Sequence, residues 1–205
     1  MEIKKITRVS IFLDYDNFAI SYCNKFKLKE EDISIWDGLC DLFAKYYENI
    51  FIKNDFEVVD HIGTFLCVGI SEYICKEEKQ IQERFKALDR KNGFIIKYGD
   101  RIGTFKDKNG NFKLGKEKGV DAEIICQMLM GAFLDHYDAC ILMSDDRDYL
   151  PAVHRVQDYF GKKVIQAGFK KSKLREHCYG HISLEDADEN LKIESIINKK
   201  PELDK

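Results

Sequence analysis

Hydrophobic and polar positions along the chain alternate between two periods, and this alternation predicts strands interleaved with helices. The first apolar run, RVSIFL at residues 8–13, is short and rich in β-branched residues, as buried strands are, and the polar DYDN after it ends it. The other predicted strands cover residues 56–70, 94–98, 139–143, 163–167 and 181–184. Apolar positions at helical spacing predict helices near residues 34–50, 71–91, 119–134, 148–159 and 172–178. Strands that alternate with helices indicate an α/β sandwich with a mostly parallel sheet.

Two stretches of the chain depart from this alternation. Residues 101–118 are rich in glycine and lysine, and the Asn109-Gly110 pair within them predicts the turn of an exposed basic hairpin. Residues 185–205 are polar, with seven acidic residues and four lysines, and we expect them to form a surface helix or to be partly disordered. We therefore assign residues 1–184 to one domain and residues 185–205 to a polar C-terminal tail.

Charge and cysteine content narrow the class of protein. The chain has a formal net charge of -3, and its excess of acids lies in the tail, so the domain is electrically balanced. A balanced domain must contact a phosphate backbone through local patches rather than through bulk positive charge. The seven cysteines include no C-x-x-C pair, and several lie in apolar runs, as reduced core thiols do; this favours the cytoplasm. No apolar stretch approaches the ~20 residues of a membrane span, and we expect no membrane partner.

Aspartates follow two of the predicted strands and begin one of the predicted helices. Asp14 ends the first strand, Asp146 and Asp148 follow the strand at residues 139–143, and Asp121 lies in the first turn of the helix before that strand. Ligands of open parallel sheets bind at the carboxyl ends of the strands, where these segments can converge. Carboxylates that are pushed together repel one another unless a cation or a proton compensates them, and Mg²⁺ or Mn²⁺ is the usual cation for an all-oxygen cluster.

Helical phase gives Asp121 a particular direction. It heads the apolar stripe of its helix, which contains Ile124, Ile125, Met128, Leu129 and Ala132. We therefore expect its carboxylate to point toward the sheet rather than into solvent. The alternative for each aspartate is an ordinary cap or turn residue, since aspartate is favoured at helix N-termini and in loops.

Several separated strings resemble the NYN domain family, in the LabA-like branch of the PIN-like nuclease superfamily. They are FLDYDN (12–17), KGVDAEIICQML (118–129), ILMSDDRDYLPAV (141–153), GKKVIQAG (161–168) and KLREHCYGHISL (173–184), and they occur in the family's order and spacing. The resemblance runs over most of residues 8–184. It implies a PIN-like three-layer α/β/α sandwich in which an acidic cluster binds Mg²⁺ or Mn²⁺ and hydrolyses the phosphodiester bonds of RNA, single-stranded or structured.

The resemblance carries roles to particular residues. Asp14, Asp121, Asp146 and Asp148 match the family's catalytic, metal-binding aspartates. Asn17 matches the asparagine that accompanies the first aspartate, and Ser144 matches the serine that leads the paired aspartates. These two, with Lys118 and Arg147 as phosphate contacts, are the expected substrate-binding residues. The chain departs from the family at three positions: Asp145 replaces a glycine, Arg147 replaces a serine, and Gln127 stands where many members have a further aspartate.

Two basic patches are candidate contacts for an RNA backbone. One surrounds the predicted hairpin and consists of Arg101, Lys106, Lys108, Lys113, Lys116 and Lys118. The other lies near the last strands and consists of Lys162, Lys163, Lys170, Lys171, Lys173 and Arg175. Phe105, Phe112 and Phe169 are interleaved with them and either stack on unpaired bases or pack against the domain. A run of charge is more often a solvated face than a binding site.

Two other functions compete with a ribonuclease. One is a haloacid-dehalogenase-like phosphatase, because Asp14-Tyr15-Asp16 after a strand resembles its Asp-x-Asp nucleophile motif, although Phe18 does not fit that motif. The other is a non-catalytic RNA-binding or scaffolding module with a vestigial acidic pocket, which the balanced charge and Gln127 favour. The identity of the RNA, endonucleolytic or exonucleolytic cleavage, and the oligomeric state, a homo-oligomer included, stay open.

Overall fold

The computed structural model of the 205-residue chain describes residues 6–27, 58–71, 76–90, 93–103, 105–106, 108, 112–113, 115–168 and 172–184. The predicted helix at residues 34–50, the Asn109-Gly110 turn and the tail at residues 185–205 lie outside the described residues. Phe169, Lys170 and Lys171 also lie outside them.

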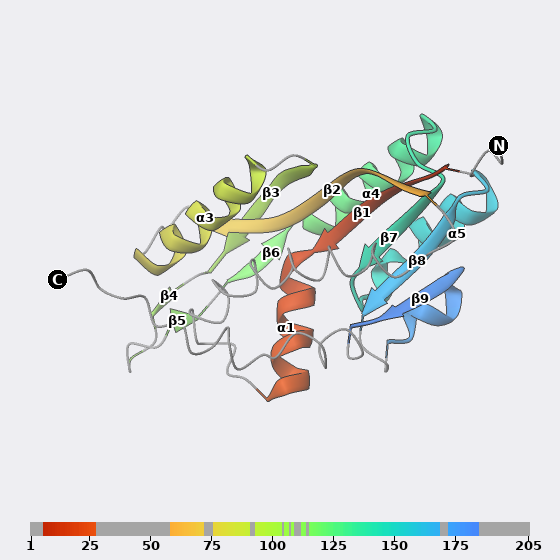
Figure 1. The fold of residues 1–205 in the computed structure, drawn as a ribbon. Helices are drawn as coiled ribbons and strands as arrows, with labels where there is room; N and C mark the ends of the chain where they lie inside the picture. The colour runs from red at the N-terminus through yellow and green to blue at the C-terminus, as the bar shows by residue number, and fades with distance from the viewer. Residues whose placement is uncertain are drawn as a thin grey trace.

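A seven-stranded sheet forms the centre of the molecule (Figure 1). Its strands, in spatial order, are β6 (Lys116–Lys118), β3 (Phe94–Ile102), β2 (Val58–Ser71), β1 (Ile6–Asp14), β7 (Ala139–Met143), β8 (Lys163–Gly168) and β9 (Gly180–Ser183). All neighbouring pairs are parallel except β3 and β6, which are antiparallel. The predicted α/β sandwich with a mostly parallel sheet is therefore confirmed.

Helices cover both faces of this sheet. They are α1 (Tyr15–Phe26), α3 (Lys76–Asp89), α4 (Val120–Phe133) and α5 (Leu150–Asp158), with short 3₁₀ turns η1 (Arg147–Tyr149) and η2 (Leu174–His177). From β1 the chain moves outward through β2 to β3, and from β7 it moves the opposite way to β8 and β9. Because parallel crossovers are right-handed, the two directions place their helices on opposite faces. Figure 1 shows α3 in front of the sheet and α4 behind it.

The central strand β1 is buried on both sides, as its unbroken apolar run predicts. Phe12 points to the face that α4 and α5 cover, where its ring stacks on Phe65 with centroids 5.2 Å apart and meets the edge of Tyr137 at 5.9 Å. After the strand ends, Tyr15 packs edge-on against Phe85 of α3 on the other face, at 4.7 Å. Asp14 therefore comes at the end of a rigid, buried strand.

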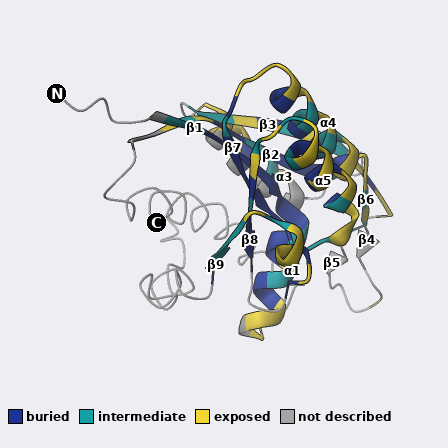
Figure 2. Ribbon diagram, turned by 90° about the vertical axis from the view of Figure 1, so that its right-hand side faces the viewer, coloured by how far each residue is buried: buried dark blue, intermediate teal, exposed yellow. Residues whose placement is uncertain are grey.

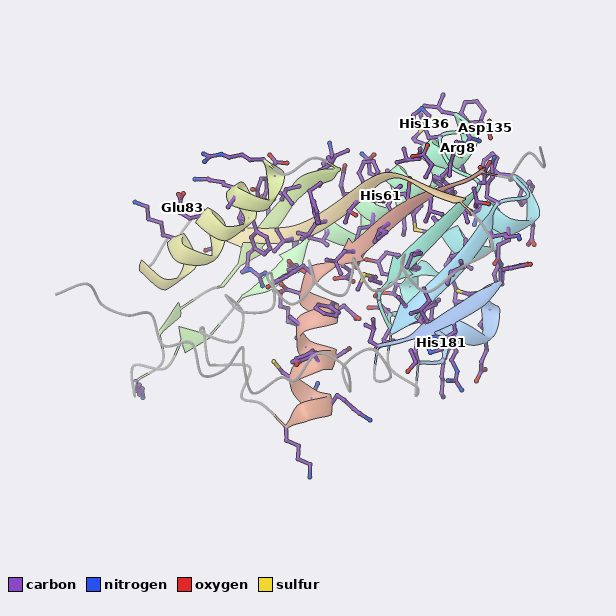
Figure 3. All side chains as sticks on the ribbon, viewed as in Figure 1. Arg8, His61, Glu83, Asp135, His136 and His181 are labelled. Atoms are coloured by element: carbon purple, nitrogen blue, oxygen red, sulfur yellow. The ribbon has the colours of Figure 1, made fainter. Side chains whose placement is uncertain are left out.

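Ion pairs lie at the end of the sheet where β1 begins. Arg8 bonds to both carboxylate oxygens of Asp138, at 3.2 and 2.8 Å, and to Asp135 at 3.1 Å. Lys162 also pairs with Asp135. Figure 3 shows Arg8 and Asp135 together at this end, far from the carboxyl end of β1. The acidic residues considered below lie at the carboxyl ends of the strands.

The predicted basic hairpin is present as a short antiparallel pair, β4 (Phe105–Lys106) with β5 (Phe112–Lys113), in which Phe105 lies opposite Lys113. None of the helices in the described ranges is long and apolar enough to cross a membrane. Of the described cysteines, Cys23, Cys67 and Cys140 are buried.

Candidate functional site

Asp14 is a buried carboxyl group at the point where β1 becomes α1. It is 4% exposed, and as the N-cap of α1 its Oδ1 accepts a hydrogen bond from the backbone N–H of Asn17 at 3.2 Å. Its Oδ2 accepts from the hydroxyls of Ser144, at 3.3 Å, and Tyr149, at 3.0 Å. Burial, with repulsion from Asp121 and Asp16, outweighs these bonds and raises the pKa of Asp14 to about 7. The carboxyl group of Asp14 therefore ionises near neutral pH, whereas in water it would ionise at a much lower pH.

Tyr149 joins Asp14 to Asp121. The hydroxyl of this fully buried ring, in η1, lies 3.0 Å from Asp14 Oδ2 and 3.0 Å from Asp121 Oδ1. A phenol has a single proton, so it can donate to only one of the two carboxylates at a time. Burial and the two neighbouring carboxylates raise the pKa of Tyr149, so the proton stays on the hydroxyl. When both carboxyl groups are ionised, the one phenolic proton cannot serve both of them, and the contact is left with an excess of negative charge.

Asp121 reaches this contact from the first turn of α4. Gly119, with φ of 83°, turns the chain from β6 into the helix, a left-handed conformation that glycine adopts without strain. The prediction that Asp121 points toward the sheet is only half right: its Oδ1 meets Tyr149 over the end of the sheet, but the residue as a whole is exposed. Helical phase places Asp121 to the side of the buried stripe, toward η1, rather than on it.

The loop after β7 holds Asp146 through Ser144. Ser144 is 2% exposed, and its Oγ donates to Asp14 and accepts from the backbone N–H of Asp146 at 3.1 Å. Asp146 is half-buried, and its Oδ1 caps η1 by accepting from the backbone N–H of Asp148 at 2.9 Å. Asp146, and not Asp148, is therefore the cap at this position. Both hydrogen-bonding functions of the Ser144 hydroxyl are used within the protein, so it positions Asp14 and Asp146 rather than facing a substrate.

Asn17 has a positioning role, and its contact with substrate stays a prediction. Its side-chain oxygen accepts a hydrogen bond from the backbone N–H of Asp145 at 2.9 Å, which ties α1 to the loop after β7. The side chain of Asp145 reaches the neighbouring strand, where its Oδ1 accepts from Gln166 Nε2 at 2.9 Å. The extra carboxylate at position 145 is thus engaged with β8.

We call Asp14, Asp121, Asp146 and Asp148 at the carboxyl ends of β1 and β7 the acidic edge. The chain leaves β1 toward one face of the sheet and β7 toward the other, so this edge lies at the topological switch point, where open α/β sheets bind their ligands. The sequence model of the NYN domain family matches residues 8–185, which include all four aspartates. The chain belongs to the NYN domain family.

Among solved structures, this NYN domain is similar to the crystal structure of a protein of unknown function from Vibrio parahaemolyticus. The two are 16% identical, the match covers 91% of this chain and 98% of that chain, and the TM-score is 0.57. At this identity the likeness shows the fold alone, which is the PIN-like α/β/α sandwich. No functionally curated protein matches the chain.

A buried arginine beside the acidic edge was predicted wrongly to belong to an exposed basic patch of the NYN domain. Arg101 is 6% exposed, and its guanidinium holds both oxygens of Asp16, at 2.6 and 2.8 Å, and Glu117 at 3.0 Å. It also donates to the carbonyls of Gly69 and Gly115. One cation between two acids leaves an excess of negative charge, and burial together with Asp16 raises the pKa of Glu117 to about 8. Arg101 is therefore a clamp on the first turn of α1, not a phosphate contact.

The remaining predicted basic residues of the NYN domain are spread over the molecule. Lys118 on β6 and Arg147 on η1 are exposed near the acidic edge. Lys162 and Lys163 lie at the amino end of β8, on the far side of the sheet, where Lys163 sits 4.6 Å over the ring of Tyr179. Because the amino ends of the parallel strands lie at the other end of the sheet from the acidic edge, Lys162 and Lys163 are not beside it.

Sequence reasoning missed Tyr149 and Gln166, and it assigned Arg101 to the wrong role. Tyr149 is a buried aromatic in a helical turn, and such a residue is ordinarily core. Gln166 is fully buried in the middle of a strand and donates to the Ser144 carbonyl at 2.9 Å, while its Oε1 lies 2.6 Å from Nδ1 of His181 on β9. The one signal for Gln166 was a polar residue inside an otherwise apolar strand.

Proposed function

We propose that this NYN domain is a metal-dependent ribonuclease that hydrolyses RNA phosphodiester bonds at the acidic edge. The observation that carries the proposal is the Tyr149 hydroxyl, which stands 3.0 Å from both the buried Asp14 and Asp121. Two carboxylates that compete for one proton attract a cation. An all-oxygen set of carboxylates suits Mg²⁺ or Mn²⁺ rather than a softer metal.

Asp14, Asp121 and Asp146 would hold the ion, with Asp148 in support. Among the residues that the structure describes, no three His, Cys, Asp or Glu side chains are grouped as a ready-made metal site. The chemistry of the donors fits nonetheless, because Asp121 is exposed and Asp146 half-buried, on the solvent side of Asp14. A bound divalent ion supplies a nucleophilic water and compensates charge on the phosphate.

The protein's own residues prepare this chemistry. Tyr149 and Ser144 fix Oδ2 of Asp14, Asn17 fixes the loop that carries Asp146, and the surrounding apolar core keeps water from the inner side of Asp14. Lys118 and Arg147, both exposed, are the proposed phosphate contacts. Membership of the LabA-like branch is part of this proposal, with Asp145 and Gln127 as the departures. Gln127 donates to Glu123 at 2.8 Å, an arrangement that an aspartate would not reproduce.

The test measures cleavage of end-labelled single-stranded and hairpin RNA by the purified chain with Mg²⁺, with Mn²⁺ and with chelator. We expect cleavage that depends on the metal and falls at least a hundredfold in Asp14→Asn and Asp146→Asn. Asp158→Asn, on the exposed end of α5, is the matched control and should cleave as the wild type does. Cleavage that survives chelation, or that survives Asp14→Asn, contradicts the proposal.

A non-catalytic RNA-binding module is the second candidate, and the lack of a ready-made metal group among the described residues favours it. Binding of RNA that is unaffected by metal, with no turnover of any substrate, would support this candidate instead. The phosphatase alternative finds less support, because Arg101 holds both oxygens of Asp16, the second aspartate of its motif.

A further inference from the structure

Helix α4 has apolar side chains on both of its sides. Its inner side packs into the core through Val120, Ile124, Met128 and Ala132, all buried. The side opposite is also apolar, whereas a surface helix ordinarily turns charged and polar residues to solvent. We call this second set the outer stripe of α4; its members are Ala122, Cys126, Leu129, Met130 and Phe133.

Most of the outer stripe is open to solvent in the single chain, although Leu129 packs against the core cluster and the ring of Phe133 meets that of Phe160, with centroids 6.3 Å apart. Met130 is 52% exposed and Phe133 is 68% exposed, Ala122 and Cys126 are exposed, and Leu129 is half-buried. Figure 2 shows α4 on the outside of the molecule beside α5, with exposed positions along it. From Ile124 to Phe133 the only polar side chain of the helix is Gln127, and it bonds back to Glu123. A contiguous apolar surface of this kind marks an interaction site.

We propose that the outer stripe is the interface of a homodimer in which two copies of α4 pack antiparallel. The side chains of the stripe grow along the helix, from Ala122 and Cys126 to Met130 and Phe133. A two-fold axis level with residues 127 and 128, between Cys126 and Leu129, sets Ala122 against Phe133 of the second copy and Cys126 against its Met130. Each small side chain then meets a large one, and close packing requires such alternation.

A second copy explains the stripe better than a different partner does. In a two-fold dimer the same patch must be complementary to itself, which this size gradient achieves when the helices run in opposite directions. The stripe has no charged member, so it offers nothing for a charged partner surface to match. The acidic edge takes no part in the contact, so the dimer does not depend on the proposed ribonuclease activity.

The stripe is small, and this sets the expected affinity. Standard interfaces use roughly 20–30 residues on each side, while the stripe and its rim supply far fewer. We therefore expect a dimer with a dissociation constant on the order of micromolar.

Sedimentation velocity of the full chain, from about 1 to about 200 μM, tests the interface. We expect a monomer–dimer equilibrium whose dissociation constant rises at least tenfold in Met130→Lys. Ile20→Lys is the matched control, because Ile20 is 38% exposed on α1, a helix that Figures 1 and 2 show apart from α4, and it should leave the equilibrium unchanged. Thermal unfolding of each variant verifies that it is folded. A wild-type chain that stays monomeric throughout, or a dimer that Met130→Lys leaves intact, overturns the proposal.

Exchange of side-chain size tests the antiparallel register. Ala122→Leu should weaken the dimer because it collides with Phe133 of the second copy, and Ala122→Leu combined with Phe133→Ala should restore it. A short bismaleimide should also cross-link two wild-type chains through Cys126, with a yield about equal to the fraction of dimer. Cys126→Ser should abolish this cross-link. If the double variant is weaker than Ala122→Leu alone, or if Cys126→Ser still cross-links, the antiparallel stripe is not the interface.

Discussion

At the residue scale, Asp14 combines almost complete burial with three hydrogen-bond donors, the backbone N–H of Asn17 and the hydroxyls of Ser144 and Tyr149. The donors favour the ionised carboxylate, and burial favours the protonated acid. Burial is the larger effect, and it raises the pKa of Asp14 from its ordinary 3.8 to about 7. The stability of the folded chain therefore depends on pH through Asp14, a group that a metal ion would also bind.

The stability of the metal-free chain should therefore fall as the pH rises through neutrality. A raised folded pKa means that the folded state binds the Asp14 proton more tightly than the unfolded state does. The resulting stabilisation is complete below about pH 4 and is lost as the pH rises through about 7, by at most about 4 kcal/mol. Asn imitates the protonated acid, so Asp14→Asn should gain stability relative to the wild type between pH 5 and pH 8.

Urea unfolding in chelator at both pH values measures this difference. Glu117, whose pKa is raised to about 8, contributes in the same direction in both proteins; because repulsion from Asp14 is the smallest of the effects that shift this pKa, the comparison reports chiefly on Asp14. If the difference in free energy of unfolding between Asp14→Asn and the wild type is the same at pH 5 and at pH 8, Asp14 does not titrate in this range.

Tyr149→Phe removes the hydroxyl between Asp14 and Asp121 and keeps the buried ring. Asp14 Oδ2 then retains only the 3.3 Å bond from Ser144, so a buried acceptor loses its shorter partner. We expect the free energy of unfolding to fall by about 1–3 kcal/mol at neutral pH. Tyr159→Phe is the control, since Tyr159 is 81% exposed and its hydroxyl contributes little. Chemical denaturation of both variants decides the matter, and a loss as small as that of the control would remove Tyr149 from this account.

At the scale of elements, β8 supports the loop that carries Asp146. Gln166 donates to the Ser144 carbonyl and to Asp145, each at 2.9 Å, and so holds the loop after β7 from the neighbouring strand. The end of β8 must leave room for this arrangement. A Cβ at Gly168 would collide with the side chains of Gln166 and Asp145.

Gly168→Ala should therefore displace the loop and destabilise the chain. We expect a loss of about 1–3 kcal/mol, as overpacking of a close contact ordinarily costs, together with weaker binding of Mn²⁺. Gly63→Ala on β2 is the matched control, because a Cβ there meets its nearest atoms at 3.8 Å, an ordinary contact. Thermal unfolding and Mn²⁺ titration followed by calorimetry measure both effects. A variant that unfolds and binds Mn²⁺ like the control would show that the space over Gly168 does not hold the loop.

The elements themselves were largely predictable. The strand at residues 139–143 was predicted with the bounds that the structure has, and the predicted helix at residues 119–134 differs from α4 by one residue at each end. The helix predicted from residue 148 begins instead with the η1 turn, because Asp146 caps that turn and Pro151 lies in the first turn of α5. The periodicity of the sequence shows which side of an element is apolar. These elements could be predicted because they pack against the rest of the domain through that apolar side.

The direction of individual side chains was less predictable. Asp121 was expected among the buried residues of α4, and it lies instead at their border, because an acid at the helix start can reach sideways to Tyr149. Arg101 was expected in solvent because its neighbours in sequence are lysines and glycines. Its partner Asp16 is 85 residues away along the chain, and no local pattern reports such a pairing.

At the scale of the whole molecule, the sheet class followed from the alternation of strands and helices, but the order of the strands did not. Periodicity is the same for a strand at the centre and for one nearer the edge when helices cover both faces. The order places β1 between β2 and β7, and only this order brings the end of the first strand beside the end of the strand at residues 139–143. The acidic edge is a property of that order.

The same order has a consequence for how the chain is made. β1 is translated before the other strands of the sheet, yet the hydroxyls that hold Asp14 belong to residues 130 and 135 positions later. A nascent chain cannot assemble the acidic edge until Tyr149 has emerged from the exit tunnel, by which time the greater part of the domain has been translated. Whatever chemistry this edge performs is thus withheld from a nascent chain until Tyr149 can fold onto Asp14.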